Sequence, residues 1–386
     1  MGGGSLRRWL LVLYAAVVVF ATWQRAGPRR EHTTFPIFRQ SYAHLAAHQD
    51  LYAAYPAEQG ASVEDRFKYS PSAAVLFAPL RIAPFSLALL AWNLLNAGLL
   101  VLAISSALPP NRANLALLLL APEVLCALQS SSSNALVAAL LIFAALAHDT
   151  GRMFRGGFLI AVGTAVKLFP VAGVVFVVMH ADRRRAVAAM IAAGVVVFAL
   201  PLLLLSPHEL LRQYRSWGLL ELSDTRDVLF GMSLMRQIRQ VSSFGWPNWV
   251  LQVAGTIVFL LPLALRPDRW ASAEFRFHYL CSMLIYVVLF NHQAERQSFI
   301  IAATGAVLWF ANGQRTVERG VIVALALVGI PTWPYLALWL MIHLELLAEA
   351  HQRVGAVPIH APLEAERLVG RRERQFRYPR AVGTSF

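Results

Sequence analysis

Long apolar runs separated by short polar connections constrain this chain more than any other feature of its sequence. A helix needs about 20 residues to cross a hydrocarbon core of about 30 Å. The runs that reach or approach this length are 9–23, 85–108, 115–128, 135–147, 186–205, 249–265 and 277–290. Only 14% of the residues are charged, whereas soluble proteins carry roughly 25%. The sequence therefore predicts an all-α, polytopic integral membrane protein with about 11–13 membrane helices.

Positive charge is concentrated in the short connections between the apolar runs and in the C-terminal tail. The net charge is +13, and its sources include Arg152, Arg155, Arg183, Arg184, Arg185, Arg266, Arg269, Arg315, Arg319 and the arginines of 367–380. Lys and Arg in short loops mark the cytoplasmic side of a membrane protein, and a basic tail also binds anionic lipid head groups. No RNA- or DNA-binding motif accompanies the charge, so we expect membrane lipids and no nucleic acid as its partners.

Two long segments, 24–70 and 206–248, are too polar to face lipid and contain a large share of the acidic residues. If the basic connections are cytoplasmic, both segments lie on the extracytoplasmic side. The sequence thus predicts one transmembrane domain over 1–349, with these segments as its two long extracytoplasmic loops. A basic cytoplasmic tail, 350–386, follows and is expected to be partly disordered.

Finer features are expected within this plan. Between Pro71 and Arg112 the topology requires an odd number of crossings, so the short piece before Pro84 should be re-entrant or interrupted. Apolar residues recur at helical spacing in 38–48, which predicts an amphipathic helix on the membrane surface. The segment 234–241 has a similar pattern in the second loop. The N-terminal apolar run lacks a convincing cleavage site and is expected to remain as the first helix.

Several kinds of site are not expected. Cys126 and Cys281 lie inside apolar runs, so they build neither a disulfide framework nor a metal site. The chain has no phosphate-binding glycine loop, no His-Glu-x-x-His pair and no Gly-x-Ser-x-Gly turn. We therefore expect no metal and no cofactor. If the protein uses a high-energy donor, we expect that donor to be carried in the membrane.

Two lysines stand out because of their surroundings. Lys68-Tyr69 directly precedes an apolar helix that begins with a proline, and a lysine at the bilayer boundary can bind a lipid phosphate. Lys167 interrupts an apolar stretch, where a charge is costly and often functional. The structural alternatives are an interfacial tyrosine anchor and a lysine whose ammonium group reaches out to the interface.

A compact polar cluster lies between two apolar runs at 291–297. It offers a titratable ring in His292, a carboxylate in Glu295 and a guanidinium group in Arg296. Histidine is suited to proton transfer or to hydrogen bonding with a phosphate near neutral pH. The cluster shares a predicted membrane face with the two long loops, which favours a functional role over a plain polar turn.

Candidate carboxylates for a general base lie in the first long loop. They are Asp50, Glu58 and Asp65, and the sequence does not rank them. Arg236 and Arg239 share a helix face at i,i+3 spacing. They either bind a pyrophosphate group or extend into water.

The order of several short motifs resembles a known family. They are Phe35-Pro36-Ile37-Phe38-Arg39, Asp50-Leu51-Tyr52, Lys68-Tyr69-Ser70-Pro71, Leu76-Phe77-Ala78-Pro79, Trp92-Asn93-Leu94-Leu95-Asn96, the polar turn from Gln129 to Asn134, Lys167-Leu168-Phe169-Pro170 and His292-Gln293-Ala294-Glu295. From about Thr33 to Trp309 the chain is similar to the polytopic GT-C glycosyltransferases. Within them it resembles glycosyltransferase family 87, whose members depend on polyprenol-phosphate-mannose.

The resemblance implies a membrane hexosyltransferase. It would move a hexose, with mannose as one candidate, from a polyprenyl-phosphate donor to a glycolipid or envelope-glycan acceptor on the extracytoplasmic face of a bacterial plasma membrane. The reaction implied is an inverting single displacement. Substrate-binding residues would be Lys68, Tyr69, Gln129, Asn134, Lys167, Arg236, Arg239 and Arg296; catalytic candidates would be His292, Asp50, Glu58 and Glu295.

One position departs from the family pattern. Family members usually carry an aspartate, the expected catalytic base, directly before the phenylalanine that corresponds to Phe35, and this chain has Thr34 there. Another group must take its role if the reaction is retained. The alternatives are a transporter or flippase of a lipid-linked solute and a catalytically inactive scaffold with the same fold. The lack of internal repeats disfavours the transporter.

Overall fold

The computed structural model describes residues 3–27, 34–53, 55, 66–223, 231–242, 245–328 and 332–348. Two of the candidate bases, Glu58 and Asp65, lie outside these residues, as does the predicted tail 350–386. The predicted domain boundary after residue 349 therefore stays a prediction.

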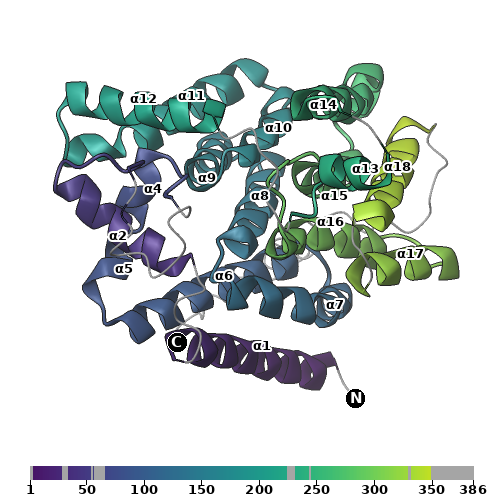
Figure 1. Ribbon diagram of the computed structural model, residues 1–386. Helices are drawn as coiled ribbons and strands as arrows, with labels where there is room; N and C mark the ends of the chain where they lie inside the picture. Colours follow the sequence, from purple (N-terminus) through teal and green to yellow (C-terminus); the bar gives the residue numbers. More distant parts are fainter. Residues whose placement is uncertain are drawn as a thin grey trace, which may run out of the picture. The chain divides into compact units, whose positions relative to one another are not determined.

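Every regular element in the described part of the chain is a helix (Figure 1), which confirms the all-α class. The first half contains α1 (Gly3–Ala26), α2 (Phe35–Ala46), α4 (Pro71–Leu76), α5 (Ala78–Ile82), α6 (Phe85–Ala107), α7 (Pro110–Gln129), α8 (Asn134–Asp149), α9 (Met153–Val166), the 3₁₀ helix η1 (Phe169–Gly173) and α10 (Val174–Val178). The second half contains α11 (Arg183–Phe198), η2 (Leu200–Leu203), α12 (Pro207–Ser223), α13 (Leu234–Val241), α14 (Asn248–Leu265), η3 (Pro267–Arg269), α15 (Ala273–Leu289), η4 (Arg296–Ser298), α16 (Phe299–Asn312), α17 (Val317–Val328) and α18 (Thr332–Leu347).

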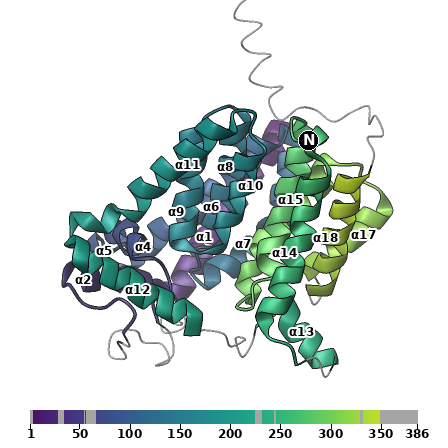
Figure 2. The same ribbon diagram turned by 90° about the horizontal axis from the view of Figure 1, so that it is seen from above.

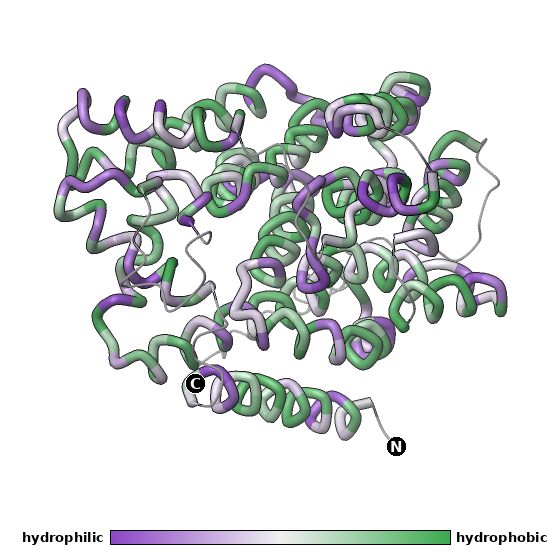
Figure 3. Tube along the Cα trace, viewed as in Figure 1, coloured by the Kyte–Doolittle hydropathy of each residue, from purple (hydrophilic) through white to green (hydrophobic). Residues whose placement is uncertain are grey.

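The chain is a polytopic membrane protein, as its apolar runs predict. Four of the described helices, α1, α6, α7 and α14, are each long and apolar enough to cross a membrane. Figure 3 shows the pattern along α1, which is apolar through its middle and hydrophilic toward its ends. Shorter apolar helices, among them α8 and α9, contribute to the same bundle. The total of 11–13 crossings stays a prediction.

Helix boundaries follow the local signals in the sequence. Pro84 is the N-cap of α6, and the chain before it forms two short helices, as expected of an interrupted piece. Proline cannot donate the backbone hydrogen bond that would continue a helix, so the break falls there. The helix expected at 38–48 is present as α2, which begins at Phe35 and ends at Ala46, and the expected helix 234–241 is α13. Phe38 and Leu45 of α2 are buried in the protein, and its location on the membrane surface stays a prediction.

Most residues of helices α8, α15 and α16 are buried, whereas α1 and α14 expose most of their apolar side chains. Helix α1 packs against α6 and α7, and α9 packs against both α8 and α11 (Figures 1 and 2). The α15–α16 contact is especially close at Gly305, where a Cβ atom would lie 2.5 Å from the carbonyl oxygen of Cys281. A side chain at this position would separate the two helices.

An aromatic cluster holds the loop segment before α4 against the bundle. Phe38 lies with its ring centroid 5.0 Å from that of Tyr69, 4.7 Å from that of Phe77 and 5.4 Å from that of Trp92. Arg39 donates hydrogen bonds to the carbonyl oxygens that end α5. Edge-to-face contacts of this kind add to the burial of the rings. The cluster thereby fixes the position of Tyr69 and its neighbour Lys68.

Candidate functional site

A cavity of about 660 Å³ brings together segments that are far apart in the sequence. Its wall is formed by the start of α2, residues 66–69, the turn before α8, the end of α9 with η1 and α10, and the last turns of α12. Helices α14 and α15 and the turn 291–298 complete it. The wall contains both polar and charged side chains, such as Lys68, Lys167 and Glu221, and apolar ones, such as Leu168 and Phe259, so its lining is amphipathic.

Lys167 is one of the charged residues of the cavity wall. Helix α9 ends there because Pro170 cannot continue it, and Lys167 itself has an extended backbone at φ −151°. Its Nζ donates a 2.7 Å hydrogen bond to Oδ1 of Asn134, the first residue of α8. Burial lowers the pKa of the Lys167 ammonium group to about 8, although the negative charge of Glu295 opposes the shift. The side chain is half-buried, and it forms part of the cavity wall.

Asn134 links Lys167 to the turn that precedes α16. Its amide nitrogen donates to the carbonyl oxygen of Gln297 at 2.8 Å and to Oγ of Ser132 at 3.1 Å. The Gln297 side chain in turn donates to the Glu295 carboxylate. Glu295 and Ser298 form a capping box that begins η4. Hydrogen bonds to fixed partners therefore hold Lys167, Asn134 and Glu295 as one connected group.

His292 lies in the same turn and in the cavity wall. The Gln252 amide nitrogen lies 3.3 Å from its Nδ1. An amide NH₂ group can only donate, so with the amide in this orientation Nδ1 accepts and the neutral ring carries its proton on Nε2. His292 is then a hydrogen-bond donor from Nε2, the form suited to binding a phosphate oxygen.

Lys68 and Tyr69 form a second polar part of the wall. The Trp217 indole donates to the carbonyl oxygen of Lys68 at 3.3 Å, and the Tyr52 hydroxyl donates to that of Tyr69 at 2.9 Å. These bonds fix the backbone of both residues in the cavity wall.

The other predicted site residues in the described part of the chain lie outside the cavity wall. The Asp50 carboxylate accepts hydrogen bonds from the backbone of Tyr52 and the hydroxyl of Ser216, and Gln129 donates to Gln24. Arg296 forms a two-bond ion pair with Glu123 of α7, both bonds at 2.6 Å. Arg236 and Arg239 lie on α13, where Arg239 donates to Asn248 and to the carbonyl oxygen of Trp246.

The cavity also contains residues that sequence reasoning did not select. Glu221 comes from the end of α12, Arg66 directly precedes the aromatic cluster, and Gln252 is a polar residue inside the apolar helix α14. Only Gln252 carried a local signal, a polar side chain in an apolar run. Thr34 lines the cavity as well, and its hydroxyl donates to the carbonyl oxygen of Ser130 at 3.3 Å.

The comparison with protein families fits this geometry. The model of glycosyltransferase family 87 matches residues 67–291, more than half of the chain. The chain belongs to glycosyltransferase family 87. It is accordingly a membrane glycosyltransferase. The match begins directly before Lys68 and ends directly before His292, so it contains Lys68, Asn134, Lys167 and Glu221 of the cavity wall. No curated protein sequence matches the chain.

Proposed function

We propose that this glycosyltransferase moves a hexosyl group, with mannose as the first candidate, from a polyprenyl-phosphate donor to a glycolipid or envelope-glycan acceptor. The expected location is the extracytoplasmic face of a bacterial plasma membrane. The observation that carries the proposal is the amphipathic lining of the cavity. A lipid-linked sugar phosphate has a charged head and an apolar tail, and the wall offers a surface for each.

The apolar part of the wall supports the choice of a lipid-linked donor. It includes Leu168 and Val171, close to Lys167 in the sequence, and Phe259 and Leu260 of α14. Leu168 is 51% exposed and Val171 47% exposed. Apolar side chains that remain exposed beside a cation suit the first isoprene units of a polyprenyl chain.

The donor phosphate is proposed to bind at Lys167 and His292, with Asn134 as the residue that positions Lys167. Lys167 supplies a positive charge, Nε2 of His292 supplies a hydrogen bond, and the N-terminus of α8 adds the positive end of a helix dipole. Negative charge grows on the phosphate as its bond to the sugar breaks. Fixed donors aimed at that charge are usually the largest single catalytic contribution.

Glu221 is proposed as the general base. In an inverting displacement the acceptor hydroxyl attacks the anomeric carbon from the side opposite the leaving phosphate. The attacking oxygen forms the new glycosidic bond, the polyprenyl phosphate leaves with the electron pair of the broken bond, and the hydroxyl proton passes to the base. Among the described residues the cavity carboxylates are Glu221 and Glu295. Glu295 belongs to the Lys167 group, on the phosphate side, which leaves Glu221 for the acceptor side.

The test is sugar transfer in proteoliposomes from radiolabelled polyprenyl-phosphate mannose to lipid acceptors of the source cell. Glu221→Gln should lower turnover by about 10²–10⁴-fold, the usual contribution of a general base. Lys167→Ala should raise the donor KM and lower kcat, whereas Asp50→Asn, outside the cavity wall, should retain most activity.

Other outcomes would replace the proposal. If Asp50→Asn abolishes transfer and Glu221→Gln does not, the base is Asp50. Labelled lipid that crosses the bilayer without donor consumption indicates a transporter. If neither sugar transfer nor lipid transport is seen with any of several donors, Thr34 marks a loss of activity.

A further inference from the structure

Helix α12 has two faces of different character. Figure 2 shows it running across the direction of α11, from which it is separated by η2 and a short turn. Gln213 on one face is 2% exposed, whereas on the opposite face Leu211, Leu219 and Leu222 are 69%, 61% and 78% exposed. The helix is therefore attached to the protein along one side only.

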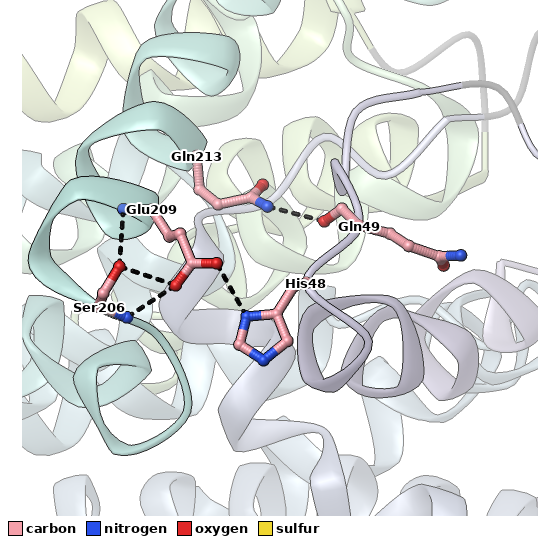
Figure 4. A network of polar contacts seen from close by, with 5 residues as sticks. All are labelled: His48, Gln49, Ser206, Glu209 and Gln213. Atoms are coloured by element: carbon pink, nitrogen blue, oxygen red, sulfur yellow. Dashed lines mark hydrogen bonds and ion pairs between the residues drawn. The ribbon is translucent and has the colours of Figure 1, made fainter.

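The inner face is fully engaged with the first long loop. Figure 4 shows the Gln213 amide donating to the carbonyl oxygen of Gln49 at 2.7 Å, and its carbonyl accepts from the backbone of Leu51 at 3.2 Å. Glu209 accepts from the backbone and hydroxyl of Ser206, and it pairs with Nδ1 of His48 at 3.0 Å. The hydrogen bonds from Ser206 lower the pKa of Glu209 to about 2. The helix is thus capped and anchored without help from its outer face.

The outer face alternates leucine with arginine. Leu211, Arg215, Leu219 and Leu222 follow one another at helical spacing, Arg212 lies beside them, and both arginines are exposed. Leu203, shortly before α12, is 76% exposed and extends the apolar surface. Leucines on one face flanked by basic side chains are typical of a helix that lies in the plane of the membrane interface. Arginine stems cover apolar surface while their guanidinium groups reach the head groups.

We propose that the outer face of α12 lies on the bilayer surface, with its leucines at the boundary of the acyl chains and Arg212 and Arg215 on the phosphates of anionic lipids. The partner is the membrane itself. Charge complementarity identifies its chemistry, because Arg212 and Arg215 on this face attract anionic head groups.

The contact reaches the cavity through the inner face of the same helix. Trp217 donates to the carbonyl oxygen of Lys68, and Glu221 lies one turn further in the cavity wall. Docking of α12 on anionic lipid therefore orders the segment that contains Lys68. The catalytic meaning of this link rests on the proposed function, whereas the lipid contact does not.

The lipid contact is tested by spin labels in nanodiscs. Single cysteines replace Leu211 or Leu222 in a chain in which Cys126 and Cys281 are alanine, with Val195 of the exposed α11 surface as a lipid-facing reference. We expect dissolved oxygen to relax the spin labels at positions 211 and 222 more than a water-soluble nickel complex does. The label at position 195 should show the same preference. Greater relaxation by the nickel complex at both positions would place α12 in water and overturn the proposal.

The link to Lys68 is tested by hydrogen exchange of peptides covering 66–72, in nanodiscs with and without phosphatidylglycerol. Exchange should slow several-fold with the anionic lipid in the unaltered chain and in the control Arg152→Gln/Arg155→Gln. The variant Arg212→Gln/Arg215→Gln should lose this response. An equal response in all three chains would overturn the link. Neither measurement depends on sugar transfer, so a failure of the lipid contact can be distinguished from a failure of the proposed function.

Discussion

At the scale of single residues, Lys167 combines two properties that a phosphate site needs. It carries a positive charge, and its Nζ is held by Asn134 at 2.7 Å. Burial has a cost, because the ammonium group loses hydration and its pKa falls to about 8. The charge of the site is consequently sensitive to pH in the range where most assays are made.

This sensitivity predicts a pH-dependent donor affinity. Below about pH 8 the lysine is protonated and binds the phosphate; as the pH rises through that value the charge is lost, and the donor KM should increase by about tenfold per further pH unit. In Lys167→Arg the guanidinium group stays protonated, so the donor KM should stay flat. Initial rates at several donor concentrations across this range check the prediction. A flat profile in the unaltered chain, or the same rise in Lys167→Arg, would contradict it.

The sequence identified residues whose surroundings are locally unusual. Lys68, Lys167 and His292 were selected because a charged or titratable group lies beside an apolar run, and all three line the cavity. Glu221 has no such signal, because carboxylates are common in polar loops. Only the fold shows that Glu221 lines the cavity. Glu123 does interrupt the apolar run 115–128, but its partner Arg296 is 173 positions away, and no spacing rule predicts that pair.

At the scale of helices, the sequence predicted several elements because the spacing of apolar residues and the position of proline act locally. It did not predict α12, which lies in a segment expected only to be a polar loop. Pro84 separated α5 from α6 as expected, and α13 has the predicted bounds. How closely two helices approach is set by both partners, so it was not predicted. Gly305 illustrates this, because its contact is with the backbone of Cys281 in another helix.

Gly305→Ala should therefore destabilise the protein although alanine is the better helix former. The added Cβ meets the carbonyl oxygen of Cys281 at 2.5 Å, and overpacking of this kind costs about 1–3 kcal/mol. The matched control is Gly98→Ala in α6, where a Cβ meets nothing within 4 Å. Thermal unfolding in detergent measures both. Equal unfolding temperatures for the two variants would show that α15 and α16 separate without cost.

At the scale of the whole described bundle, the cavity depends on connections between distant segments. The turn that contains His292 and Glu295 is joined to α7 by the Arg296–Glu123 ion pair. Glu123 is 3% exposed and Arg296 39% exposed at their side chains. Two bonds of 2.6 Å between charged groups fix both distance and orientation. In this arrangement Arg296 holds the turn, whereas Lys167, the residue proposed to bind the phosphate, lies in the cavity wall.

Removing one partner of this pair distinguishes the two roles of Arg296. Arg296→Met leaves the Glu123 carboxylate buried without its partner and should cost about 3 kcal/mol, the low end for a buried pair because Arg296 is partly exposed. The double variant Glu123→Gln/Arg296→Met removes both charges and should recover most of the stability. If Arg296 only positions the turn, the double variant also recovers most of the sugar transfer. The contrary outcome is a double variant that unfolds at the original temperature and yet transfers no sugar. Its stability would then be restored while the positive charge at position 296 is absent, and this outcome would assign Arg296 to the donor phosphate.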